Sequence, residues 1–210
     1  MNKDIIKQYS CELIGTFFLT LAVLVTSNPL AVGIMLAGLV YIGTFISGGH
    51  YNPAVTLSLW LNGRFSLHHV PGYMLAQLCG AWGAGALSYY LLGKIVFTAP
   101  LVSLGTLKPM MLEMLGCFVF VSVVLEATST ERADATINAL MIGLALASVA
   151  FLWGAYSGGA FNPAVGIGPV LFDMAKGGSS GWLIPIYCMG PFAGALVASI
   201  FHGWWRGKVL

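Results

Sequence analysis

The chain has 210 residues, of which 58% are hydrophobic and only 8% are charged. Soluble domains carry about 25% charged residues, so this composition excludes an ordinary water-soluble fold and indicates that lipid is the main solvent. The net charge of +2 is too small to indicate a nucleic-acid partner. Isolated cysteines within apolar runs predict no disulfide and no metal site, and no motif predicts a cofactor. These cysteines are Cys11, Cys79, Cys117 and Cys188.

Six apolar stretches are long enough to approach the roughly 20 residues that cross a bilayer, so the sequence predicts an all-α membrane protein with six transmembrane helices. In chain order they are Ile6–Thr26, Leu30–Ile46, Val70–Leu92, Pro109–Ala127, Ile137–Trp153 and Trp182–Trp205. Two further apolar segments, Asn52–Leu61 and Asn162–Phe172, are too short to span alone at about 1.5 Å per helical residue. They are either surface pieces or re-entrant half-helices.

The distribution of Lys and Arg predicts the orientation in the membrane. Six spans place both termini on one side, and the side with more Lys and Arg faces the cytoplasm. One side would hold Lys3, Lys7, Arg64, Arg132, Arg206 and Lys208, and the other only Lys94, Lys108 and Lys176. We therefore expect an integral protein of the cell (inner) membrane with both termini in the cytoplasm.

The regions around the two short segments are copies of each other. Ser47–Val55 matches Ser157–Val165 at seven of nine positions with an offset of 110, and the same offset relates Gly33 to Gly143. We expect one domain, 1–210, built from two repeats at 1–97 and 108–210. Each repeat holds three spans, so the second copy is inverted. Broken helices at matching places of inverted halves indicate a site at the membrane midplane.

Each short segment begins with Asn-Pro-Ala, a typical helix start because Asn is a favoured N-cap and Pro is favoured at the first helical position. The motif residues are Asn52, Pro53, Ala54, Asn162, Pro163 and Ala164. Two re-entrant helices starting at the midplane would point their positive dipole ends at each other. Irregular backbone at that depth must line a cavity or be buried in protein. The sequence therefore predicts a pore where the two Asn amides converge.

Glu12 and Glu113 lie in the first helix of each repeat, and carboxylates within a membrane rarely face lipid. One interpretation is a proton-coupling group. The other, which their symmetric placement favours, is structural: each carboxylate accepts hydrogen bonds from the backbone of a re-entrant loop.

The paired Asn-Pro-Ala loops, the six spans and the Glu pair resemble the aquaporin and aquaglyceroporin (major intrinsic protein) family over nearly the whole chain. The resemblance implies a passive channel for water and small uncharged solutes, not an enzyme, and a homotetramer with a pore in each subunit. It also implies that donors and helix dipoles at the pore centre repel cations and protons.

The chain departs from the family at the filter, which usually has an Arg three positions after the second Asn. Val165 occupies this position, and the other filter positions fall on Val32, Ala150 and Gly159. We expect a wide, apolar and uncharged constriction with glycerol, urea, ammonia and metalloid acids as candidate solutes. His50 either lines the cytoplasmic vestibule or is a packed histidine bonded to a carbonyl.

Two other classes of membrane protein remain as alternatives. Ion- or proton-coupled transporters also use inverted repeats and broken helices. We expect no charged side chain near either half-helix tip, which disfavours a transporter. A structural membrane protein with a closed pore is the third class.

Overall fold

The computed structural model describes residues 3–26, 28–129 and 134–207, and all regular secondary structure in these ranges is helical. The α-helices are α1 (Lys3–Val25), α2 (Pro29–Gly43), α3 (Pro53–Leu61), α4 (Val70–Leu92), α5 (Leu107–Ala127), α6 (Ala135–Ser157), α7 (Pro163–Ala175) and α8 (Ile184–Trp205). Short 3-10 turns at Leu67–His69, Val102–Leu104 and Ser180–Leu183 precede α4, α5 and α8. The predicted all-α membrane fold, with six long helices and two half-helices, is confirmed.

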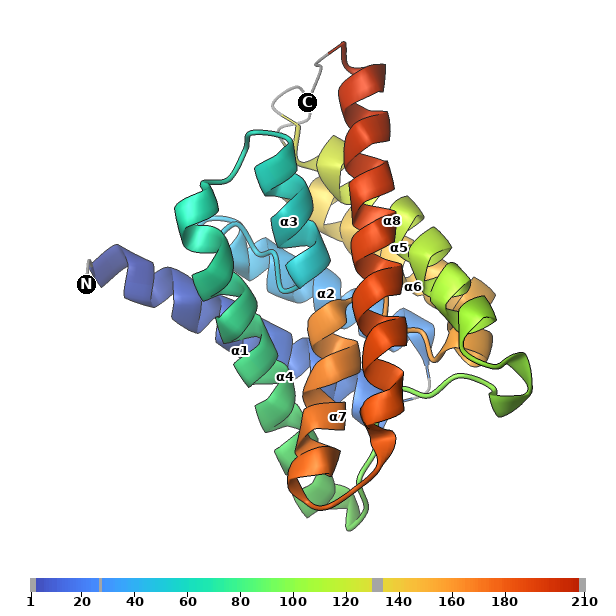
Figure 1. Cartoon of the computed structure of the whole chain (residues 1–210). Helices are drawn as coiled ribbons and strands as arrows, with labels where there is room; N and C mark the ends of the chain where they lie inside the picture. Colours follow the sequence, from blue (N-terminus) through green and yellow to red (C-terminus); the bar gives the residue numbers. More distant parts are fainter. Residues whose placement is uncertain (1–2, 27, 130–133, 208–210) are drawn as a thin grey trace.

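The two halves of the chain pack in the same way. Helix α1 packs along α4 as α5 packs along α8, while α2 and α6, the second helices of the two repeats, pack on each other. The short helices α3 and α7 enter from opposite ends, and their N-terminal tips meet near the middle of the molecule (Figure 1). This arrangement is the inverted repeat that the sequence predicts.

Not every predicted span has the predicted length. Helices α1, α5, α6 and the segment ending in α8 are both long and apolar enough to cross a membrane by themselves. Helix α2 stops at Gly43 instead of Ile46 and has 15 residues, about 22 Å at 1.5 Å per residue. Helix α4 has 23 residues but is less apolar, because polar side chains such as Gln77 and Ser88 occupy its buried face. Helix α6 runs four residues beyond the predicted Trp153, to Ser157.

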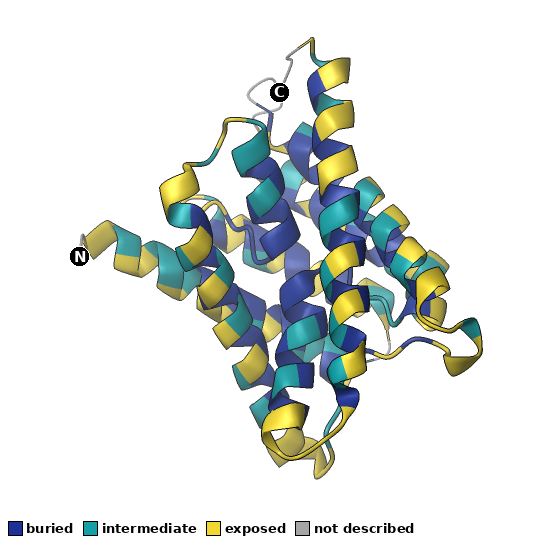
Figure 2. Cartoon of the chain, viewed as in Figure 1, coloured by how far each residue is buried: buried dark blue, intermediate teal, exposed yellow. Residues whose placement is uncertain are grey.

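Burial follows the expectation for a bundle in lipid. The faces that meet in the interior are buried, and the outward faces of the long helices are exposed (Figure 2). Large apolar side chains cover those outward faces; Ile34 and Ile42 of α2, for example, are each 63% exposed. Such a surface is stable in hydrocarbon and unfavourable in water.

Small residues let the paired helices approach closely, as in other lipid-embedded bundles. A Cβ atom on Gly80 of α4 would collide with the carbonyl oxygen of Leu13 in α1. At the matching place in the second half, a Cβ on Gly190 of α8 would lie 2.7 Å from the carbonyl oxygen of Met110 in α5. Both repeats therefore have close backbone-to-backbone packing between their first and third long helices.

Arg and Lys side chains lie at both ends of the helix bundle. Arg64 and Arg206 lie at the same end, since Arg64 donates to the Leu125 carbonyl at the end of α5 and Arg206 pairs with the neighbouring Glu126. Lys176 lies at the other end, with its ammonium 5.7 Å from the centre of the Tyr89 ring. Arg132 and Lys208 lie outside the described residues.

Candidate functional site: the junction of the two half-helices

The two Asn side chains cap the half-helices and also join them. Asn52 Oδ1 accepts the Ala54 N–H at 2.8 Å, and Asn162 Oδ1 accepts the Ala164 N–H at 2.9 Å. On the other side of each amide, Asn52 Nδ2 donates to the Phe161 carbonyl at 3.0 Å and Asn162 Nδ2 to the Tyr51 carbonyl at 2.8 Å. An amide nitrogen carries two hydrogens, so each Asn keeps a second N–H beyond this reciprocal pair.

The residues just before the two Asn have an unusual backbone conformation. Tyr51 has φ = 50° and Phe161 has φ = 45°, values that bulky residues rarely adopt and that cost of order 1–3 kcal/mol. The Gly-Gly pairs upstream also have positive φ in both loops. This conformation turns the Tyr51 and Phe161 carbonyls toward the opposite loop, where the Asn amides bind them. The strain is therefore part of how the two tips are joined.

Buried carboxylates hold the strained loops in place. Glu12 accepts the backbone N–H groups of His50 at 3.0 Å and Tyr51 at 2.7 Å, and the Ser47 hydroxyl at 2.7 Å. In the second half, Glu113 accepts hydrogen bonds from the matching three groups.

The three donors to Glu113 in the second half are Ala160 N at 3.1 Å, Phe161 N at 2.6 Å and Ser157 Oγ at 2.7 Å. The geometry fits the structural interpretation of the Glu pair, in which each carboxylate supports a loop. The expectation of no charged side chain near the tips is wrong, because both carboxylates bind the loop backbone directly before Asn52 and Asn162. Neither Glu12 nor Glu113 lines either of the two cavities beside the loops, so both carboxylates lie behind the loops.

The first loop has an additional hydrogen-bond network that the second lacks. Gln77 Nε2 donates to Glu12 Oε2 at 2.8 Å and to Thr56 Oγ1 at 3.0 Å. Thr56 Oγ1 donates to the Asn52 carbonyl and lies 3.1 Å from His50 Nδ1. A Thr56 hydroxyl that donates to the Asn52 carbonyl accepts from His50 Nδ1–H, and in that tautomer Nε2 of neutral His50 is an acceptor. The second loop has Ala160 in place of His50.

Two cavities run along the bundle, and the half-helix junction borders the larger one. The larger has a volume of about 640 Å³ and is lined by Asn52 and Asn162 together with side chains from α1, α2, α5 and α6. The smaller, of about 340 Å³, is lined by α2, α5, α6 and the first loop. The lining residues follow the helices at four-residue spacing, for example Val32, Leu36 and Val40 along α2. Such stripes are the inner faces of helices that surround a path.

The structure brings the predicted filter residues together in the larger cavity. Val32, Ala150, Gly159 and Val165 all line it, from α2, α6, the second loop and α7. Three have aliphatic side chains and the fourth is glycine, so their side chains bring neither charge nor a hydrogen-bonding group. His50 lines both cavities and bonds to a hydroxyl, Thr56, where the packed alternative expected a carbonyl.

The outer end of the smaller cavity has a polar rim. Thr128 and Ser129 line the cavity there, and Arg64 donates to the Thr128 hydroxyl at 2.9 Å. Burial, followed by the proximity of Arg206, lowers the pKa of Arg64 from its ordinary value. Among the described residues no group of three His, Cys, Asp or Glu side chains is placed to hold a metal ion.

Several residues of the site were not identified from the sequence. Ser47, Ser157, Tyr51 and Phe161 were available as matching positions of the repeat, but their carboxylate and amide partners lie far away in the chain. Phe120 lines both cavities. It has no sequence signal, because it stands among the other apolar residues of α5.

Comparisons with known proteins agree with this geometry. Residues 2–202 match the Major intrinsic protein family. The chain is 34% identical over 181 residues to the aquaporin AqpM of Methanothermobacter thermautotrophicus, covering 82% of this chain and 74% of that protein.

It is also 32% identical to the glycerol uptake facilitator protein-like 6 of Lactiplantibacillus plantarum, covering 92% of this chain and 95% of that protein. The fold is similar to that of the aquaglyceroporin from Plasmodium falciparum, with a TM-score of 0.84, 20% identity and coverage of 94% and 95%. The chain therefore belongs to the major intrinsic protein family, whose members are membrane channels and not enzymes.

Proposed function

We propose that the chain conducts water and small uncharged solutes, glycerol and metalloid acids among them, through a path that follows the two cavities past Asn52 and Asn162. The observation that carries this proposal is that, among the described residues, no charged side chain lines the larger cavity. A fixed Arg side chain in a narrow pore reduces its diameter and adds hydrogen-bond donors and an electrostatic barrier, whereas aliphatic side chains and a glycine leave a wider opening. The names of two relatives, an aquaporin and a glycerol uptake facilitator protein-like 6, support water and glycerol among these solutes.

The four residues Val32, Ala150, Gly159 and Val165 are proposed as the selectivity level of this path. Val165 is buried to 1% exposure and stands where the family usually has Arg. We further propose a homotetramer in the cell membrane with both termini in the cytoplasm. The apolar outer faces of the long helices and the common end of Arg64 and Arg206 support this arrangement.

Stopped-flow measurements on proteoliposomes test the proposal. Wild-type vesicles should take up glycerol and boric acid at rates proportional to concentration, without any ion gradient and in the presence of protonophore. Saturable uptake that collapses with the ion gradient would instead establish a coupled transporter, and impermeability to every solute including water would establish a closed pore.

The Val165→Arg variant tests the selectivity level. It should reduce glycerol permeability by roughly tenfold or more while water permeability is retained. Val165→Met, which adds length without charge, is the matched control. An unchanged solute profile in Val165→Arg would place the selectivity level elsewhere.

A further inference from the structure

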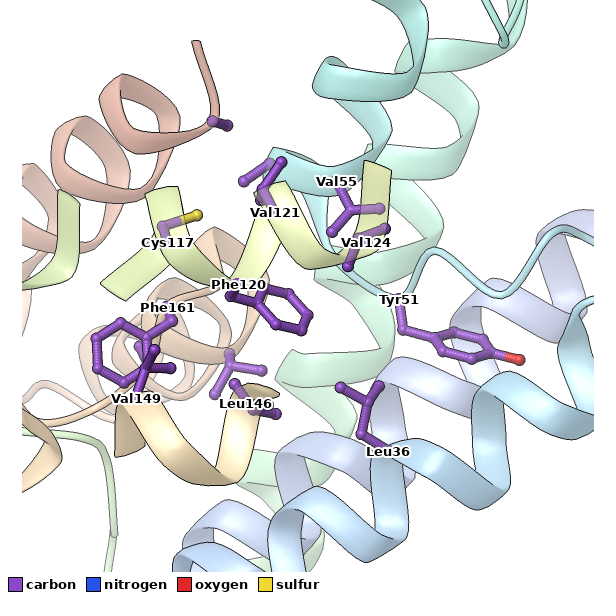
Figure 3. Close-up of a cluster of buried hydrophobic side chains, with 14 of the residues drawn as sticks. Leu36, Tyr51, Val55, Cys117, Phe120, Val121, Val124, Leu146, Val149 and Phe161 are labelled. Carbon is purple, nitrogen blue, oxygen red and sulfur yellow. The ribbon is translucent and has the colours of Figure 1, made fainter. Parts of the chain in front are cut away.

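The two cavities meet at three side chains. Leu36 of α2, His50 of the first loop and Phe120 of α5 line both cavities, and no other described residue does so. All three are buried, with exposures of 2%, 7% and 3%. We refer to these three residues as the central ring. Figure 3 shows the Phe120 ring projecting from α5 into the interior space that Leu36 also faces.

The central ring lies about one helical turn from the selectivity level. Along α2, Val32 lines only the larger cavity, Leu36 lines both, and Val40 lines only the smaller one. Four residues of helix correspond to a rise of about 6 Å. Helix α5 has the same order, because Phe120 lines both cavities and Val124 only the smaller one. A solute on this path therefore passes the selectivity level and the central ring one after the other.

The selectivity level and the central ring differ in the bulk of their side chains. The selectivity level contains Ala150 and Gly159, which leave space, whereas the central ring contains a phenyl ring, an imidazole and a branched aliphatic chain. The His50 imidazole is held by Thr56 from α3, and Thr56 is held in turn by Gln77 from α4. One side of the ring is therefore fixed by hydrogen bonds, and the other two sides pack in the main hydrophobic cluster.

We propose that the central ring, and not the selectivity level, sets the upper size limit for solutes. The inference rests on the proposed channel function. Leu36 and Phe120 supply two apolar sides of the ring, and the His50 imidazole supplies the third.

Permeability to linear polyols of increasing length, from glycerol to sorbitol, tests the proposal in proteoliposomes. Phe120→Ala should move the length limit upward and raise ribitol permeability roughly tenfold or more, while glycerol permeability changes less. Leu36→Phe should move the limit downward. The matched control is Phe118→Ala, which makes the same change on the same helix; Phe118 lines neither cavity and packs against Phe201 with 6.0 Å between ring centres.

The outcomes separate this inference from the proposed function. Opposite shifts of the length limit in the two ring variants, with none in Phe118→Ala, support the central ring. An unchanged limit in folded Phe120→Ala and Leu36→Phe overturns it and leaves the channel function intact. Wild-type vesicles that conduct neither water nor glycerol overturn the channel function and the ring together. If Phe120→Ala is not recovered folded by gel filtration, Leu36→Phe and Leu36→Ala decide by the same criterion.

Discussion

Gly33 of α2 and Gly143 of α6 pack directly against each other at equivalent positions of the two repeats. A Cβ atom on Gly33 would lie 2.5 Å from the Gly143 carbonyl oxygen, and a Cβ on Gly143 would collide with the Gly33 carbonyl oxygen. The contact is thus reciprocal, as expected where two inverted halves meet across their local symmetry axis. It brings two pore-lining helices into backbone contact.

Gly33→Val should therefore destabilise the fold, because the neighbouring atoms are backbone and cannot move aside. We expect a cost of about 1–3 kcal/mol or more, the range for overpacking a close-packed interior. Gly38→Val is the matched control on the same helix, since a Cβ there meets nothing within 4 Å. Thermal denaturation in detergent measures the difference; equal melting temperatures for the two variants would contradict the packing.

Glu113→Gln should weaken the second loop. The three groups that Glu113 binds are all donors, so an amide would present its own N–H₂ to at least one of them. Leaving a buried donor unpaired costs about 1–3 kcal/mol. We expect a lower melting temperature and reduced solute flux at constant protein, compared with Asp4→Asn at the exposed start of α1. If Glu113→Gln keeps full stability and flux, the carboxylate is not needed to hold the loop.

Asn52→Asp should admit cations. The substitution replaces a donor by a negative charge at the point where the positive ends of α3 and α7 converge, and that charge offsets the barrier from the dipoles. Asn52→Ser keeps a helix-capping oxygen without the charge and serves as the control. Sodium and proton flux into vesicles, followed with enclosed fluorescent dyes, should rise only in the Asp variant. Equal leakage in both variants would show that lost packing, and not charge, opens the path.

Much of this fold could be predicted from the sequence because its key residues occur twice. The matching Ser-Gly-Gly and Asn-Pro-Ala runs predict two half-helices, and the inverted order of the spans brings their tips together. The roles of Glu12 and Glu113 followed from symmetry, since a buried charge at both equivalent places must meet equivalent donors.

Other features could not be predicted because they depend on distances between helices. Leu36 and Phe120 look like ordinary core residues, and only the packing of α2 against its neighbours shows that they line both cavities. The positive φ angles of Tyr51 and Phe161 arise from hydrogen bonds to distant residues, which no local pattern contains. Helix α2 ends early because the chain tightens into a turn after Gly43, whose carbonyl accepts the N–H groups of Ile46, Ser47 and Gly48.

Thiol blocking tests most directly whether solutes follow the two cavities past the joined tips. Ala150→Cys places a thiol in the lining of the larger cavity, whereas none of the four native cysteines, all within the described residues, lines either cavity. Leu152→Cys on the same helix is the control, because Leu152 is 60% exposed on the outer surface.

A small membrane-permeant thiol reagent should abolish most glycerol flux through Ala150→Cys, and a reductant should restore it. Wild type and Leu152→Cys should keep their flux under the same treatment. Full flux through Ala150→Cys after mass spectrometry has shown complete modification of that cysteine would contradict the account, because solutes would then bypass the cavity where Asn52 and Asn162 meet.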